Sequence, residues 1–143
     1  VVAIDIASAA VETTRENALR LELVDRVTVL QGAWFDPCAG RRFDLIASNP
    51  PYIAADDARV EPGVRRYEPA DALFSGSTGL EALQVIAAGA PLHLRPGGWL
   101  VVEHGDTQGA AVRAFCSATG FEDVRKFRDL SGLERCTEGR LRG

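Results

Sequence analysis

The feature that most constrains this chain is a short apolar run that ends abruptly in Asn49-Pro50-Pro51-Tyr52. Residues 43–48, which precede it, are rich in branched and apolar side chains, a pattern typical of a buried strand. Neither proline can donate a hydrogen bond to a neighbouring strand, and a residue that precedes a proline avoids the helical region. We therefore predict a rigid loop at the carboxyl end of a strand, where open α/β sheets bind their ligands.

This loop carries two hydrogen-bond acceptors on adjacent residues. Asn49 has a side-chain carbonyl and Pro50 has a backbone carbonyl, and together they can accept both hydrogens of a planar NH2 group. Tyr52 supplies a flat amphipathic wall. The alternative is an ordinary turn, since Asn-Pro and Pro-Pro are common between strands and loops. We favour a substrate-binding role for Asn49, Pro50, Pro51 and Tyr52, with Asn49 and Pro50 acting in catalysis.

Composition excludes several classes of protein. The 143 residues suffice for one domain with a real core, which we place at residues 1–143. No apolar run approaches the ~18 residues that a membrane span requires. The three cysteines form no CxxC pair, so we predict reduced thiols in a cytoplasmic protein and no metal site. The net charge of -4 gives no support to direct nucleic-acid binding.

Apolar periodicity predicts strands that alternate with helices. This order, closed by a hairpin, predicts a three-layer α/β domain with a mostly parallel sheet. The predicted strands cover residues 1–6, 27–31, 43–48, 99–103, 121–127 and 135–141, and the predicted helices cover residues 8–23, 80–94 and 107–119.

A long segment without regular periodicity, residues 53–78, separates the predicted strand 43–48 from the helix that follows. It contains many charges and turn-forming residues. Connections of this length in compact domains usually have a function, so we predict a loop that faces the substrate. Glu68 lies in this segment and is a candidate substrate-binding residue.

Two residues near the ends of the first strands are candidates for nucleotide binding. Asp5 ends the first strand, where a carboxylate can accept hydrogen bonds from ribose hydroxyls. The alternative is a helix-capping aspartate, which we disfavour because Ser8 is better placed to cap the next helix. Trp34 follows the strand at 27–31, and it fits an adenine contact and a core position equally well. We interpret His104 as a hydrogen-bonded loop residue and not as a catalyst.

These residues resemble a known family along essentially the whole chain. The resemblance is to the catalytic domain of the release-factor glutamine N5-methyltransferases (HemK/PrmC type), which are class I, Rossmann-like, S-adenosylmethionine-dependent enzymes. Asn-Pro-Pro-Tyr is shared with other amino-methylating enzymes, whereas the Glu68-Pro69 segment and the last hairpin are narrower signals. The segments that carry the resemblance are 3–6, 34–35, 43–53, 67–73, 79–80, 96–98, 103–105 with Gln108, and 129–132 with Arg135.

The resemblance implies a cofactor, a substrate and a partner. S-adenosyl-L-methionine would be held by Asp5 at its ribose and by Trp34 near its adenine, with Asn49 beside it. Asn49 and Pro50 would bind the amide of the glutamine in the Gly-Gly-Gln loop of a peptide chain release factor. Ala33 stands where the family usually has an acidic residue.

The resemblance also implies that the chain begins at the second strand of the fold. A first strand, its glycine-rich loop and an amino-terminal domain would then precede residue 1. The missing strand would leave unpaired edges in the sheet, so we expect residues 1–143 alone to be loosely packed, without cofactor binding or activity.

Three other functions are compatible with the sequence. The substrate could be a glutamine of a ribosomal protein or an exocyclic amine of a nucleic-acid base, or the chain could be an inactive, truncated domain. A base substrate should require a basic groove lined by aromatic side chains. Only Arg65, Arg66 and Tyr67 provide such residues near the predicted loop.

Overall fold

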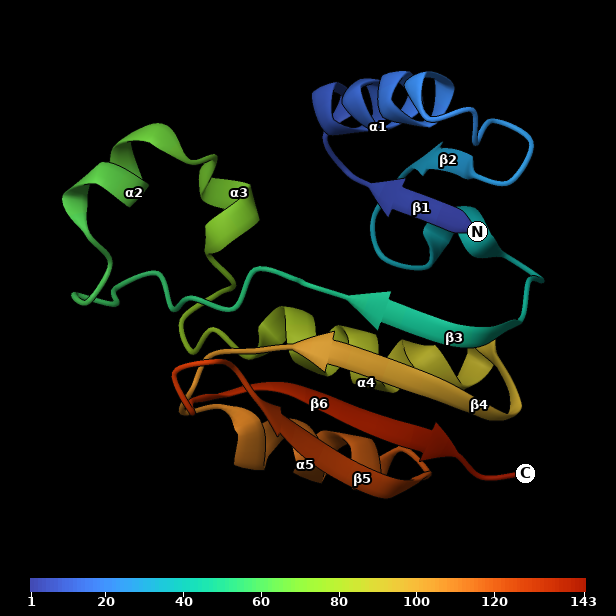
Figure 1. Cartoon of the computed structure of the whole chain (residues 1–143). Helices are drawn as coiled ribbons and strands as arrows, with labels where there is room; N and C mark the ends of the chain where they lie inside the picture. The colour runs from blue at the N-terminus through green and yellow to red at the C-terminus, as the bar shows by residue number, and fades with distance from the viewer. The chain divides into compact units, whose positions relative to one another are not determined.

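The chain alternates between strands and helices, as a computed structural model shows (Figure 1). The structure describes the backbone of residues 1–143 and every side chain except those of Pro62 and Arg65. The predicted contribution of Arg65 to a basic groove therefore lies outside the described residues. The chain forms two compact units, Val1–Arg41 and Arg42–Gly143, each of which is described by itself.

The first unit is a parallel pair of strands joined by a helix. The strands run in register from Val2 opposite Thr28 to Asp5 opposite Gln31. The helix contacts both strands and buries Val11 and Ala18, which lie seven residues apart on one helical face. The elements of this unit are β1 (Val2–Asp5), α1 (Ser8–Arg20), β2 (Thr28–Gln31) and the 3-10 helix η1 (Asp36–Cys38).

The start of α1 differs from the prediction. Ala7 is the N-cap residue and Ser8 is already inside the helix, so Ser8 does not cap it. Asp5 Oδ1 instead accepts a hydrogen bond from the Ala7 N–H at 2.8 Å. The carboxylate reaches this N–H because it lies only two residues before it, a local turn that aspartate favours.

The second unit contains a four-stranded sheet in the order β3-β4-β6-β5. The pair β3–β4 is parallel, and β6 pairs antiparallel with both β4 and β5. Together with the parallel first unit, this confirms the predicted α/β class with a closing hairpin. The strands are β3 (Phe43–Ser48), β4 (Leu94–Glu103), β5 (Phe121–Arg128) and β6 (Glu134–Leu141).

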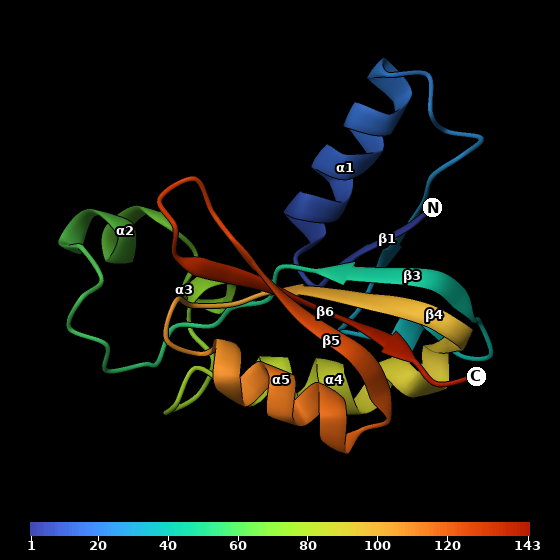
Figure 2. The ribbon, with the colours of Figure 1, turned by 60° about the horizontal axis from the view of Figure 1, so that its bottom comes forward.

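Two helices, α4 (Glu81–His93) and α5 (Gly109–Ala118), lie on one face of this sheet (Figure 2). Side chains along β4 alternate, and Leu100 and Val102 on the buried face are at most 2% exposed. The core of the unit forms where these strand residues meet apolar residues of the two helices: Leu83, Ile86, Ala90, Val112 and Cys116.

The segment 53–78 is not the plain loop that we predicted. It contains two short helices, α2 (Pro62–Tyr67) and α3 (Ala70–Leu73), and its two ends are tied together. Ile53 N donates to Leu73 O at 3.0 Å, and Ser75 N donates to Ile53 O at 2.8 Å. Helices of four to six residues leave almost no periodic pattern, which explains why the sequence did not indicate them.

Two general expectations can be compared with the structure. Cys38, Cys116 and Cys136 are free thiols, as predicted. Within the described residues, no helix is long and apolar enough to cross a membrane.

Candidate active site

The predicted loop lies directly after β3, at its carboxyl end, and we call residues 49–52 the acceptor loop. Asn49 is exposed, whereas Pro50 is buried. Among the described residues, neither the Asn49 side chain nor the Pro50 carbonyl has a hydrogen-bond partner. Both acceptors are therefore available to a ligand, as the sequence predicted, although their role in catalysis stays a prediction.

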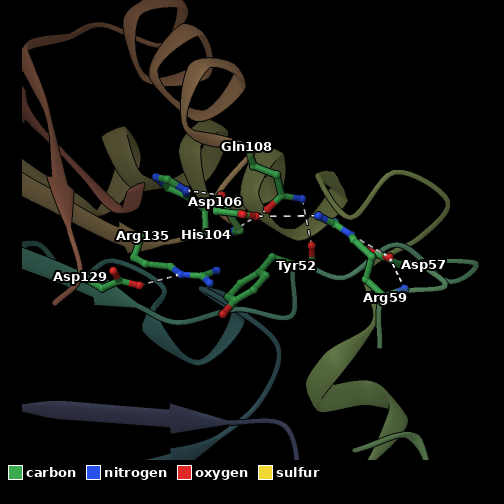
Figure 3. A network of polar contacts seen from close by, with 9 residues as sticks. Tyr52, Asp57, Arg59, His104, Asp106, Gln108, Asp129 and Arg135 are labelled. Atoms are coloured by element: carbon green, nitrogen blue, oxygen red, sulfur yellow. Dashed lines mark hydrogen bonds and ion pairs between the residues drawn. The ribbon is translucent and has the colours of Figure 1, made fainter. Parts of the chain in front are cut away.

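The side chain of Tyr52 is held in place by a hydrogen bond. Its hydroxyl donates to Glu103 Oε1 at 3.0 Å, and Glu103 is the last residue of the neighbouring strand β4. Burial of the ring and the hydrogen bond to Glu103 raise the pKa of the Tyr52 phenol. The phenol therefore stays protonated and keeps donating at neutral pH. Arg135 points toward the ring from β6 (Figure 3).

The backbone carbonyl of Tyr52 is also held by a hydrogen bond. Gln108, the N-cap residue of α5, donates from Nε2 to Tyr52 O at 2.9 Å and to Gly79 O at 3.1 Å. The same side chain accepts from Gly105 N at 2.8 Å (Figure 3). One amide thus joins the acceptor loop to the segment before α4 and to the segment after β4.

A cavity of about 480 Å³ adjoins Tyr52 within the second unit. Charged residues of both signs line it, including Arg59, which contacts Asp57 at 2.7 Å and Asp106 at 4.0 Å (Figure 3). The lining combines these charges with apolar side chains, a mixture that is typical of ligand sites. Its other lining residues include Ile53, Ala54, Val60, Glu61, Val64, Thr78, Gly105, Gln108 and Arg135.

Within the second unit, Glu68 is a predicted site residue that lies apart from the hydrogen bonds of the acceptor loop. It is the exposed C-cap residue of α2, and its backbone N–H donates to Val64 O at 3.0 Å. None of the contacts among the described residues joins Glu68 to the acceptor loop. Its substrate-binding role stays a prediction.

Three residues were predicted to bind the cofactor: Asp5 and Trp34 lie in the first unit, and Asn49 lies in the second. Asp5 is exposed at the end of β1, and its Oδ2 has no hydrogen-bond partner among the described residues. Trp34 is 37% exposed and has a positive φ of 46°, which is uncommon for a bulky residue. The exposure of Trp34 disfavours its core interpretation, and the roles of Asp5 at the ribose and Trp34 at the adenine of S-adenosylmethionine stay predictions.

The last hairpin places an ion pair beside Tyr52. Asp129 accepts backbone hydrogen bonds from Ser131 and Leu133 at the turn, and its Oδ2 lies 3.3 Å from Arg135 Nε. The Leu133 hydrogen bond is the main cause of the lowered pKa of Asp129. The turn thus fixes Asp129, and Asp129 in turn directs Arg135 toward the cavity (Figure 3).

His104 is a structural residue, as predicted. It is fully buried, and its ring nitrogens lie 2.9 Å from Gly105 O and 2.9 Å from Thr137 Oγ1. A carbonyl can only accept, so Nδ1 is the protonated nitrogen that faces Gly105.

Sequence reasoning missed the partners that orient Tyr52. From the sequence, Glu103 was interpreted only as the end of a strand, and Gln108 was interpreted only as part of the family resemblance. A polar residue at the last position of an apolar strand, next to the predicted loop in the sheet, is the signal that could have indicated Glu103. Gln108 offered no such signal, because its contacts join residues 29 and 56 positions away.

Comparison with curated proteins gives the chain its relatives. It is 48% identical over 143 residues to a release factor glutamine methyltransferase of Xylella fastidiosa, covering 100% of this chain and 52% of that protein. It is 47% identical over 139 residues to the protein of the same name from Pseudomonas aeruginosa, covering 97% of this chain and 50% of that protein. The chain thus spans about half the length of these relatives. No protein-family model matches it.

Solved structures support the fold. A methyltransferase from Pyrococcus furiosus matches 99% of this chain and 62% of its own, with a TM-score of 0.71 and 19% identity. A release-factor-specific protein-(glutamine-N5) methyltransferase from Alicyclobacillus acidocaldarius matches 99% of this chain and 79% of its own, with a TM-score of 0.53 and 24% identity. The chain has the fold of the S-adenosylmethionine-dependent class I methyltransferases, and along its whole length it is homologous to the release factor glutamine methyltransferases.

Proposed function

We propose that the protein methylates the side-chain amide nitrogen of the glutamine in the Gly-Gly-Gln segment of a peptide chain release factor. The observation that carries this proposal is the pair of open acceptors, Asn49 and Pro50, in a chain that is 48% identical to a release factor glutamine methyltransferase. A glutamine side chain ends in the planar NH2 group that such a pair can hold.

S-adenosylmethionine, when bound, supplies a methyl group that its sulfonium already activates. An amide nitrogen is a poor nucleophile because its lone pair is delocalised into the carbonyl, so the chain must contribute alignment. Asn49 Oδ1 and Pro50 O accept one N–H each and thereby fix the direction of the nitrogen. Positioning of this kind can contribute ~7–11 kcal/mol to lowering a barrier. The same oxygens stabilise positive charge that develops on the nitrogen.

Tyr52 contributes a fixed wall to this site. Its hydroxyl is held by Glu103, and its backbone carbonyl is held by Gln108, so the ring has little freedom. A wall that does not move confines the planar amide, and this raises the fraction of bound substrate in a reactive orientation. The Asp5 and Trp34 side chains would hold the cofactor from the first unit.

The experiment that tests the proposal is methyl transfer from labelled S-adenosylmethionine, carried out with the full-length protein that contains this chain. We expect label on a release factor and none on the same factor after its Gly-Gly-Gln glutamine is changed to alanine. Ribosomal proteins and nucleic acid are incubated in parallel, and mass spectrometry locates the label. Label on a ribosomal-protein glutamine or on an adenine would replace the proposal with one of those substrates. A cytoplasmic location is part of the same proposal, since release factors act there.

A further inference from the structure

Gln108 uses every hydrogen-bonding group of its side chain within the second unit. Its Nε2 donates to Tyr52 O and Gly79 O, at 2.9 Å and 3.1 Å, and its Oε1 accepts from Gly105 N at 2.8 Å. A primary amide has two N–H donors and one carbonyl. Both donors are engaged within the protein, so the side chain has no free N–H for a substrate.

Gly79 is packed closely against Tyr52 and Gln108. A Cβ atom on Gly79 would lie 2.5 Å from Tyr52 O and 3.0 Å from Gln108 Nε2, and Gly79 has a φ of +75°. The backbone at 79 therefore lies against the Tyr52 carbonyl, which only glycine permits. Two carbonyl oxygens, of Tyr52 and Gly79, point to the same place and repel each other unless a donor lies between them.

The Tyr52 carbonyl is mechanically coupled to the two predicted catalytic acceptors. Only Pro50 and Pro51 separate Asn49 from Tyr52, and proline rings restrict the backbone torsion φ of both residues. Since few free torsions remain, a shift at the Tyr52 carbonyl carries the Pro50 carbonyl and the Asn49 side chain with it. Beyond Tyr52, the Ile53 N–H is bonded to Leu73 O at 3.0 Å, which blocks relief in that direction.

We infer that Gln108 is a positioning residue that sets the place of the acceptor loop by donating to the Tyr52 and Gly79 carbonyls. Its contribution to turnover rests on the proposed function, because it acts through Asn49 and Pro50. Its contribution to the order of the loop does not depend on which substrate the protein uses.

Two substitutions distinguish the effect of the Gln108 hydrogen-bond donors from the effect of its side-chain bulk. Gln108→Glu keeps the shape and the acceptor for Gly105, but it turns a carboxylate toward two carbonyls. Gln108→Met keeps much of the bulk and has neither donor nor acceptor. Gln84→Glu, at an exposed position of α4, is the matched control for the charge. All variants are made in the full-length protein. Each is assayed at a temperature that lies the same number of degrees below its own thermal midpoint.

The first readout is turnover against pH. At pH 8 we expect kcat of both variants to fall about tenfold or more, while KM for S-adenosylmethionine stays within about twofold. As the pH falls, kcat of Gln108→Glu relative to wild type should recover, because a protonated carboxyl can donate one hydrogen bond. Gln108→Met should not recover. A kcat close to wild type at pH 8, or equal losses in both variants at every pH, would overturn the inference.

The second readout is hydrogen exchange in the peptide that covers residues 49–55. Loss of the donor should speed exchange at the Ile53 and Ala55 amides, which are bonded to Leu73 O and Gly76 O, compared with Gln84→Glu. Unchanged exchange would overturn the inference. If the wild-type protein labels no glutamine at all, the proposed function fails, and the exchange readout alone then decides the role of Gln108.

Discussion

The two units of the chain differ in how much structure each builds by itself. The first unit, Val1–Arg41, has a two-stranded sheet, and its buried apolar residues among the described side chains are Val11, Ala18 and Cys38. The second unit, Arg42–Gly143, has four strands, two covering helices and a larger set of fully buried apolar residues. A two-stranded sheet is at best marginally stable alone, whereas four strands packed on helices can form a stable core.

This difference has a counterpart in the predicted site. Asp5 and Trp34 are exposed residues of the first unit, and few side-chain contacts hold them. In the second unit, the acceptor loop follows β3, an edge strand of the four-stranded sheet, and Glu103 and Gln108 hold it at Tyr52. If Asn49 and Pro50 align the substrate and Asp5 and Trp34 bind the cofactor, as proposed, substrate alignment would rest on well-supported residues and cofactor binding on residues with few side-chain contacts.

The largest expected effect concerns the two cores. Leu100→Ala, in β4, removes a fully buried side chain and should lower the free energy of unfolding by about 3 kcal/mol. Val11→Ala, in α1, removes two carbons from a smaller core and should cost roughly 1.5 kcal/mol. Urea unfolding of the full-length protein measures both. Because Leu100→Ala removes three carbons and Val11→Ala removes two, equal costs would show that the first core is at least as well packed and would remove the contrast.

The next effect concerns catalysis in the second unit. Asn49→Ala should lower kcat about 100-fold, because one acceptor for the substrate amide is lost, as when a single preorganised hydrogen-bonding group is removed from other active sites. The dissociation constant for S-adenosylmethionine, measured by calorimetry, should stay within about twofold of wild type. Asn17→Ala, at an exposed position of α1, is the control and should leave both unchanged. Normal turnover by Asn49→Ala would exclude Asn49 from the mechanism.

A smaller effect is expected from the first unit. Asp5→Asn keeps the acceptor for the Ala7 N–H but removes the charge, and it should raise the dissociation constant for S-adenosylmethionine about tenfold. At saturating cofactor, kcat should be close to wild type. Asp25→Asn, which is exposed in the same unit, serves as the control. Loss of kcat with unchanged cofactor affinity would reverse the division of roles between the units.

The smallest effect concerns a charge cluster of the second unit. Hydrogen bonds from Lys126 and Arg113 lower the pKa of Glu134 from 4.5 to about 2. Because the folded pKa is depressed, the cluster stabilises the fold above pH 4.5, and this stability is lost as the pH falls toward 2. The gap in thermal midpoint between wild type and Glu134→Gln should therefore shrink over that range. Lys126→Gln should weaken the same pH dependence. A midpoint difference between wild type and Glu134→Gln that stays constant over this range would contradict the prediction.

Much of the fold could be predicted because its signals are local. The strand at 43–48 coincides with β3, and the helix at 80–94 matches α4 to within one residue at each end. Apolar spacing depends only on neighbours in the chain, so it survives without tertiary information. The same holds for the rigidity of Asn49 and Pro50, which the proline rings impose locally.

The errors occurred where no local signal exists. Helices α2 and α3 are too short for a periodic pattern, and α1 begins one residue earlier than a Ser8 cap requires, with Ala7 as its N-cap residue. Glu68 is a different case, because the Glu68-Pro69 segment of the resemblance suggested it and no contact among the described residues joins it to the acceptor loop. Its role, like those of Asp5 and Trp34, remains a prediction for binding experiments.

The sequence by itself determined the α/β class, the place of the acceptor loop after a strand, and the presence of two adjacent acceptors, since each follows from side-chain type and spacing. Only the tertiary structure decided what holds that loop. The hydrogen bonds of Tyr52 to Glu103 and Gln108 join residues more than 50 positions apart, and the packing of Gly79 depends on a carbonyl from another segment. Such contacts form when distant segments meet in the fold, and no pattern along the chain encodes their distance.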